Sequence, residues 1–201
     1  MVKSRHLAVW SLSVAAALAA GCDGSSKQSK PGAGGAAALS AEAQSAATGD
    51  IPDNQAFLVF RNRPAGYSIK YPEGWTQVGA AKDVTFKDKN NIVHVVVTSG
   101  PAPTLGQASA QLTKLKRSNP SLVVTAPPRN VTVKGTPMIK SGYLTRSAPN
   151  AVTGKRVTLV VDRYQVADPK TGNLATVDLG TAKGVDNVDA YRMMIESFKW
   201  R

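Results

Sequence analysis

Cysteine and histidine are nearly absent from this chain of 201 residues, which contains one cysteine and two histidines. Because Cys22 is the sole cysteine, no disulfide can form within the chain, and a folded domain must be stabilised by its apolar core. His94 is the only histidine after the first 21 residues. A typical zinc site takes four Cys, His or carboxylate ligands. We therefore expect no metal site and no disulfide framework.

Residue sets for catalysis are equally scarce. A Ser–His–Asp triad would have to use His94, and the sequence has no Gly-x-Ser-x-Gly nucleophile elbow. His94 lies within an apolar, strand-like run, which favours a structural histidine. Asp162, Asp168 and Asp178 lie on late strand-like runs, but their spacing matches no calcium loop. These observations predict a protein that is not an enzyme and has no cofactor; an uncharacterised hydrolase is the least favoured alternative.

Aromatic residues make up only 6% of the chain, although its net charge is +12. A module that binds single-stranded nucleic acid needs aromatic side chains for base stacking among its basic residues. No such alternation is present, so we expect no nucleic acid as a partner.

Long apolar runs are also missing. The longest, residues 7–20, is interrupted by serines and is shorter than the roughly 20 residues that span a membrane. It follows Lys3 and Arg5 and leads through small residues to Cys22. This order is typical of a cleaved export signal. Residues 1–21 are therefore predicted to be a signal peptide.

The signal ends in Ala19-Ala20-Gly21-Cys22, which resembles a bacterial lipobox, with Leu18 one position before the usual place of the branched residue. The resemblance implies a lipoprotein whose Cys22 carries fatty acyl chains such as palmitate. Two acyl chains anchor a protein stably, since each buried CH₂ contributes about 0.8 kcal/mol. We expect the protein outside the cytoplasm, anchored to the cell membrane by Cys22. The alternative is a soluble secreted protein with an unmodified cysteine.

Residues 22–56 are rich in Gly, Ala and Ser and poor in large apolar side chains, which predicts a lipidated flexible tether. About 30 residues of flexible coil reach roughly 30 Å. Periodic apolar segments begin at Phe57, so residues 57–201 are predicted to be the folded domain. Four of the 25 basic and four of the 13 acidic residues precede Phe57. The domain therefore holds 21 basic and 9 acidic residues and keeps the whole charge of +12.

A basic surface of this kind attracts anionic partners. Outside the cytoplasm these are envelope lipids and wall polymers; a protein partner is a further possibility, and an ordinary solvated basic surface is the alternative to any partner. The basic residues of the late segments are the candidates for a binding patch. They are Arg146, Lys155, Arg156 and Arg163, with Lys134 and Lys140 on neighbouring runs.

Apolar periodicity predicts strands before and after one central helix. Residues 67–71 alternate apolar and polar side chains, and residues 83–86 and 92–97 flank a turn. Thr104 is a plausible N-cap for a helix that ends at Asn119-Pro120. Further strand-like runs follow at residues 122–125, 129–134, 138–146, 156–166 and 174–179, with a turn at Pro127-Pro128 between the first two.

A second helix is expected near the end of the chain. Asp186 is its candidate cap, and its apolar face is predicted to contain Val188, Tyr191, Met194, Ile195 and Phe198. Many short strands with one central and one terminal helix indicate the α+β class, an antiparallel sheet covered by helices.

The segment Gly66-Tyr67-Ser68-Ile69-Lys70-Tyr71-Pro72-Glu73-Gly74-Trp75 resembles the opening motif of the PsbP-like superfamily. The final Ser197-Phe198 is similar to the close of those domains. The resemblance implies a PsbP-like αβ sandwich with a non-enzymatic binding or assembly role, as in actinobacterial Lpq-type lipoproteins. It also implies that Gly74 permits a turn and that Trp75 fills the core.

Together these features predict a membrane-anchored bacterial lipoprotein with a non-catalytic binding or assembly domain in the cell envelope. The main alternative is a carrier or sensor of an anionic amphiphilic envelope ligand. Such a ligand would lie between sheet and helix, with basic residues at the mouth.

Overall fold

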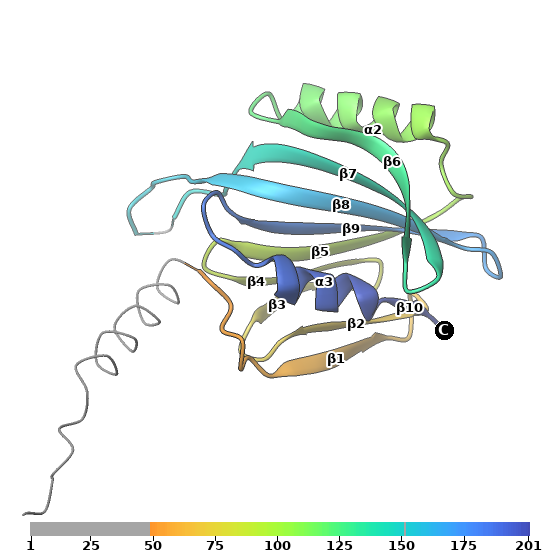
Figure 1. Cartoon of the computed structure of the whole chain (residues 1–201), viewed down its shortest axis with the longest axis horizontal. Helices are drawn as coiled ribbons and strands as arrows, with labels where there is room; N and C mark the ends of the chain where they lie inside the picture. The colour runs from red at the N-terminus through yellow and green to blue at the C-terminus, as the bar shows by residue number, and fades with distance from the viewer. Residues whose placement is uncertain (1–48, 151) are drawn as a thin grey trace, which may run out of the picture.

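The computed structural model describes residues 49–150 and 152–201. Within them the chain forms two antiparallel sheets and two helices (Figure 1), which confirms the predicted α+β class. The elements, in chain order, are β1 (Phe57–Asn62), β2 (Tyr67–Pro72), β3 (Thr76–Ala80), β4 (Asp83–Asp88), β5 (Asn91–Ser99), α2 (Leu105–Ser118), β6 (Val123–Val133), β7 (Thr136–Arg146), β8 (Thr158–Asp168), β9 (Asn173–Ala182), α3 (Val188–Glu196) and β10 (Lys199–Trp200).

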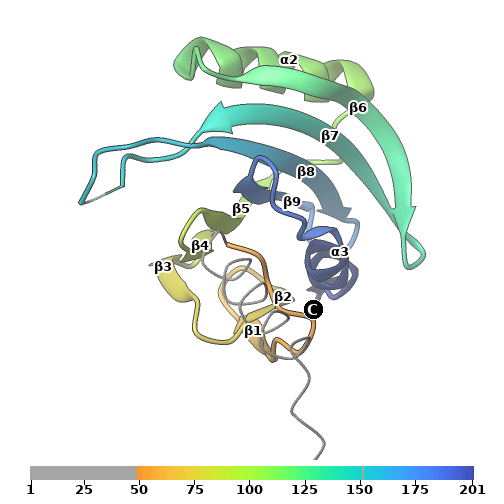
Figure 2. The ribbon, with the colours of Figure 1, turned by 60° about the vertical axis from the view of Figure 1, so that its left-hand side comes forward.

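The larger sheet has seven strands in the order β3-β4-β5-β9-β8-β7-β6, and the smaller sheet has the order β1-β2-β10. Figure 2 shows α2 lying along β6 on one side of the large sheet, while α3 lies on the other side, between the two sheets. The two faces of the large sheet are therefore covered by different elements. We call them the outer face, on the α2 side, and the inner face, on the α3 side.

The inner face holds the main core. Alternation along β5 turns Val93, Val95 and Val97 inward, each at most 3% exposed. They pack with residues of β2, β4, β9 and α3 in one cluster. Aromatic rings fill its centre, where Phe86 packs against Phe60 at 5.1 Å and stacks on Tyr71 at 4.2 Å between ring centroids. This burial of apolar surface is the main source of the fold's stability.

The predicted opening motif takes its expected structural place. Tyr67 and Ile69 of β2 are fully buried in the core. Gly74 adopts a φ of 87°, a left-handed value that favours glycine and turns the chain after β2. Trp75 follows half-buried and packs against the edge of the core, so it covers the core more than it fills it.

The helix α2 begins at a capping box. The Thr104 hydroxyl accepts a hydrogen bond from the backbone N–H of Gln107, and the Gln107 side chain accepts one from the backbone of Thr104. Ala108 and Leu112 are its buried residues, and Leu112 packs in a small outer cluster with Leu122, Tyr143, Leu159 and Val161. Neither helix in the described part of the chain is long and apolar enough to cross a membrane.

The helix α3 buries Tyr191, Met194 and Ile195 in the main core, as its apolar spacing predicts. Three details differ from the prediction. Phe198 lies beyond the end of the helix at Glu196, although its side chain is buried in the same core. Val188 is 65% exposed, because it stands at the first turn, beyond the edge of the core. The N-cap position belongs to Asn187, although the Asp186 carboxylate still accepts a hydrogen bond from the Val188 N–H at 3.2 Å.

The structure corrects one predicted turn and adds two strands that were not predicted. The turn expected at Pro127-Pro128 is instead part of β6, a continuous strand whose register shifts between Val124 and Arg129. β6 is an edge strand, and prolines are tolerated there because their missing N–H groups are not needed for pairing with a second neighbouring strand. Neither β3, whose five residues are all exposed, nor the two-residue β10 carries an apolar alternation that predicts a strand.

Residues 49–56, which composition assigns to the tether, are held against the domain. Asn91 and Asn187 both donate a side-chain hydrogen bond to the Gly49 carbonyl, at 2.5 and 3.1 Å. Asn187 also bonds Thr181 and accepts from the Ile51 N–H. These side chains form a buried amide network that fixes the chain where it enters the fold. The folded unit thus begins at least eight residues before Phe57.

Candidate functional site

Three of the four candidate patch residues come together around the connection between β7 and β8. Arg146 ends β7, and Lys155 and Arg156 precede β8. Arg156 Nη1 donates a hydrogen bond to the Ser147 carbonyl at 2.8 Å, and Arg146 Nη2 donates to the Arg156 carbonyl at 3.4 Å. All three side chains are exposed. Their charges therefore face solvent, and hydrogen bonds within the connection hold its two ends together.

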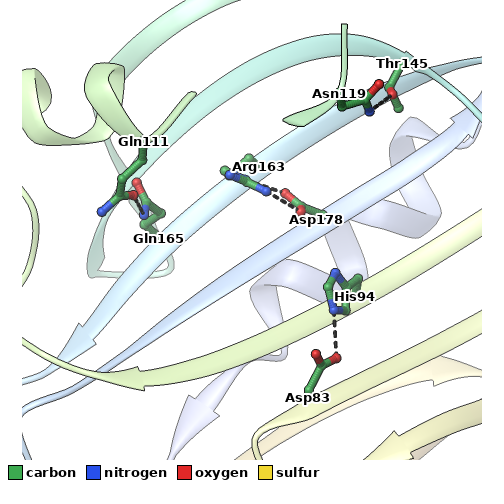
Figure 3. Close-up of polar contacts among 8 residues, drawn as sticks. All are labelled: Asp83, His94, Gln111, Asn119, Thr145, Arg163, Gln165 and Asp178. Atoms are coloured by element: carbon green, nitrogen blue, oxygen red, sulfur yellow. Dashed lines mark hydrogen bonds and ion pairs between the residues drawn. The ribbon is translucent and has the colours of Figure 1, made fainter. Parts of the chain in front are cut away.

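The end of α2 lies beside this connection. Asn119 Nδ2, at the C-cap of α2, donates a hydrogen bond to Thr145 Oγ1 at 2.7 Å (Figure 3). The contact joins the last turn of α2, with exposed Lys116 and Arg117, to the last residues of β7. Basic residues are common in the last turn of a helix, where they interact favourably with the helix dipole. The place of these two cations beside Arg146 follows from the packing of α2 on the sheet.

Arg163 does not belong to this exposed group. It lies within β8 on the outer face, where its guanidinium makes two hydrogen bonds to Asp178 of β9, at 2.7 and 2.6 Å (Figure 3). The side chains are only 14% and 13% exposed. Arg163 also lies 5.4 Å from the ring centroid of Tyr143. The pair is a structural contact that crosses two central strands.

The electrostatics of this pair follow from its burial. Burial alone would lower the pKa of Arg163, but the hydrogen bonds and charge of Asp178 raise it above its ordinary value. Burial raises the pKa of Tyr143 as well, and the nearby Asp178 charge adds to the shift. Both groups therefore keep a single protonation state at neutral pH, which suits a structural role better than proton transfer.

The two remaining basic strand residues are also paired. Lys140 Nζ lies 2.7 Å from Asp162 Oδ2 and 5.1 Å from the centroid of the Tyr164 ring, on the inner face. Lys134 Nζ lies 3.2 Å from Glu196 Oε2 of α3. The six basic residues named from the sequence therefore divide into an exposed trio at one end of the sheet and three that are engaged by carboxylates.

The acidic residues considered as calcium ligands are dispersed. Asp162 pairs with Lys140, while Asp178 pairs with Arg163 on the opposite face. Asp168 caps the β8–β9 turn by accepting hydrogen bonds from Thr171 and Lys170. Within residues 49–150 and 152–201, no group of three or more His, Cys, Asp or Glu side chains is placed to hold a metal ion.

His94 lies on the outer face of β5, where Nε2 is 2.8 Å from Asp83 Oδ1 (Figure 3). Its cross-strand neighbours are Thr85 and Asp178. The partner of the ring is thus a carboxylate on an exposed strand end. A Ser–His–Asp arrangement needs a hydroxyl nucleophile on one nitrogen and the acid on the other.

The structure also has a cleft that was not predicted. It is an open cleft of about 1000 Å³ at the other end of the molecule, between the β6–β7 hairpin, residues 101–103, the β8–β9 turn and the chain end. Apolar side chains such as Met138 line much of it, and Lys170 and Arg201 border it. The indole Nε1 of Trp200 is buried there without a hydrogen-bond partner in the described structure. Segments distant in sequence build this cleft, so no local motif signals it.

A second hollow, of about 620 Å³, lies between residues 50–57 and α3. Four aspartates line it, Asp50, Asp53, Asp186 and Asp189. One of them, Asp189, pairs with Arg192 of the same helix. The predicted lipidation site, Cys22, and the predicted signal peptide lie outside the described residues.

No family model and no curated protein matches the chain. Among solved structures, a protein from Bacteroides thetaiotaomicron is similar with a TM-score of 0.47 and 15% identity, over 71% of this chain and 48% of the other, so the chain spans about half of that protein. The Ran-binding protein Mog1p of Saccharomyces cerevisiae has a TM-score of 0.45 and 11% identity, over 73% and 96%. A point mutant of Mog1 gives the same TM-score with 12% identity. These similarities concern the fold alone.

Proposed function

We propose that this protein is a bacterial lipoprotein whose domain binds a partner in the cell envelope without catalysing a reaction. The carrying observation is the order of the chain, in which an export-type leader is followed by Cys22 and then by a domain that is folded from Gly49 onward. The resemblance of the opening motif to PsbP-like proteins, with their binding and assembly roles, supports the same proposal.

The placement of the titratable residues supports a non-catalytic domain. His94, Arg163 and Lys140 are each paired with a different carboxylate, on different strands and on both faces of the sheet. Acid–base catalysis requires such groups to converge on one substrate position. Here they stabilise local pairs of strands.

Substitution of the lipidation site tests the proposal. In the native host, the parent should incorporate a palmitate analogue and partition into the detergent phase, whereas Cys22→Ser should do neither. Ser25→Ala, three residues away, is the matched control and should behave as the parent. A Cys22→Ser protein that is still labelled and still in the detergent phase would refute the lipid anchor.

The cleft supports a second candidate, a carrier of an anionic amphiphilic ligand. It has the volume of a lipid-binding site, an apolar lining and two cations at its border. It lies beside the β6–β7 hairpin, away from the sheet–helix interface that the sequence analysis predicts for such a ligand. Native mass spectrometry of the protein from its own envelope extract should show a bound lipid that is lost in Ala167→Trp, which fills the cleft. An unliganded parent would exclude this candidate.

A further inference from the structure

The acidic residues are absent from one long stretch of the chain. Between Lys89 and Val161 the sequence contains ten Lys and Arg residues and no Asp or Glu. This stretch comprises β5, α2, β6, β7 and the connection to β8. Nearly half of the domain's cations therefore lie on elements that supply no carboxylate.

The fold gathers part of this charge at one end of the large sheet. The end of β7 pairs with the start of β8, which pairs with the end of β9. The contact between Asn119 and Thr145 adds the last turn of α2, and the hydrogen bond from the Lys183 N–H to the Thr158 carbonyl adds the residue after β9. We call this surface the basic end; its residues are Lys116, Arg117, Arg146, Lys155, Arg156 and Lys183.

The basic end is free of ion pairs in the described chain, unlike the other three basic residues named from the sequence. All six side chains are exposed, and none takes part in a salt bridge within the part of the chain that the structure describes. Lys134, Lys140 and Arg163, by contrast, are each engaged by a carboxylate. Only the unpaired charges keep their full attraction for an external anion.

The chain enters the domain at this same end. Gly49 is bonded to Asn91, the first residue of β5, whose neighbour Ile92 pairs with Gly180 near the end of β9. Figure 1 shows the described chain beginning on the same side as the β7–β8 connection. Cys22 precedes Gly49 by 27 residues, the segment that the sequence predicts to be a tether. A lipid on Cys22 would keep the basic end within reach of the headgroups.

We propose that the basic end docks on the anionic lipid headgroups of the membrane that anchors the protein. The inference rests on the proposed lipid anchor for its cellular setting. Tethering gives the domain a millimolar effective concentration at the membrane, so a weak electrostatic affinity is sufficient. The aspartates beside Gly49 belong to the α3 side, so the domain tilts its α2 side toward the headgroups and holds the cleft away from them.

An anionic wall polymer is the competing occupant. It would meet a basic surface anywhere on the domain, whereas a membrane is met first by the end at which the tether enters. The coincidence of the chain entry with the unpaired cations therefore favours the membrane.

Vesicle sedimentation of the processed chain tests the proposal without its lipid. Residues 22–201 carrying Cys22→Ser should bind vesicles that contain phosphatidylglycerol, and binding should weaken from low to physiological salt. Phosphatidylcholine vesicles should bind little. A basic residue near an anionic surface contributes roughly fivefold in binding. Lys155→Glu/Arg156→Glu should therefore weaken binding by at least about tenfold.

Two further variants keep the result interpretable. Lys116→Glu/Arg117→Glu changes the same surface from a different segment and should cause a similar loss, even if the first variant disturbs its loop. Lys170→Glu/Lys199→Glu makes the same change in net charge at the opposite end and should weaken binding less than about threefold.

Three outcomes would overturn the proposal. They are a parent that ignores anionic vesicles, an equal loss in the control pair, and binding to purified anionic wall polymer in place of vesicles. Because the tested chain carries no lipid, none of these outcomes depends on acylation of Cys22. A failure of the lipid anchor would appear separately, in the fractionation of the native protein.

Discussion

The two faces of the large sheet are stabilised by different chemistry. The inner face is closed by a continuous core in which an aromatic ring of β1 and one of β2 pack against Phe86 of β4. The outer face has a small apolar cluster under α2 and, next to it, polar pairs such as Arg163–Asp178. Apolar burial gains free energy without regard to direction, whereas a buried ion pair must recover a desolvation cost through its geometry. The inner face should therefore carry most of the stability, and the outer face should fix the register of β8 and β9.

The largest expected effect is on the inner face. Phe86→Ala should lower the free energy of unfolding by about 3–5 kcal/mol, because it removes a fully buried ring and leaves a cavity beside two aromatic neighbours. Urea denaturation followed by circular dichroism measures the loss. Val160→Ala, in β8 of the same large sheet, is the control. Because Val160 is 38% exposed, its substitution should lower the free energy of unfolding much less. Equal losses would mean that the core is not where the stability resides.

A smaller effect is expected from the outer pair. Arg163→Met should cost about 2–3 kcal/mol, because it leaves the Asp178 carboxylate largely buried without its two charged hydrogen bonds. The double variant Arg163→Met/Asp178→Leu removes the stranded charge and should recover most of the loss in the same assay. If the double variant is as unstable as the single one, the pair stabilises through more than charge compensation.

The smallest effect compares one tyrosine from each face. Burial raises the pKa of Tyr143 on the outer face and of Tyr191 on the inner face. A raised folded-state pKa gives stability that is fully present below the unfolded value of about 10 and is lost as the pH rises above it. The free energy of unfolding should therefore fall steeply above about pH 10, and Tyr143→Phe and Tyr191→Phe should each remove part of this fall.

At neutral pH, Tyr191→Phe should cost about 1 kcal/mol, because the hydroxyl donates a 2.5 Å hydrogen bond to the Gly180 carbonyl. Denaturation midpoints between neutral pH and about pH 11 provide the measurement. A parent protein with no alkaline loss would show that both hydroxyls are in contact with water.

Local patterns predicted most elements of the fold. The apolar run of β5, the N-cap of α2 at Thr104 and the apolar stripe of α3 are signals contained within one segment. The failures have a common cause: the missed features depend on neighbouring strands that are distant in sequence. Pro127 and Pro128 predict a turn unless the strand is known to lie at a sheet edge, where their missing N–H groups are tolerated.

Only part of the candidate site could be predicted, because the rest also depends on segments that are distant in sequence. Arg146, Lys155 and Arg156 are close in sequence, so their grouping followed from the turn between them. Arg163 is also close in sequence, but its partner Asp178 comes from the next strand, and strand register cannot be read from composition. The cleft and the contribution of α2 to the basic end depend on tertiary packing. The lack of acids from Lys89 to Val161 is the one signal in the sequence that points to the basic half of the domain.

The buried amide network at Gly49 has a mechanical consequence. Any pull exerted through the leader side of the chain is delivered to a point held jointly by β5, β9 and the start of α3. The load is thus shared among three elements of the main core, and no single exposed strand is peeled from an edge.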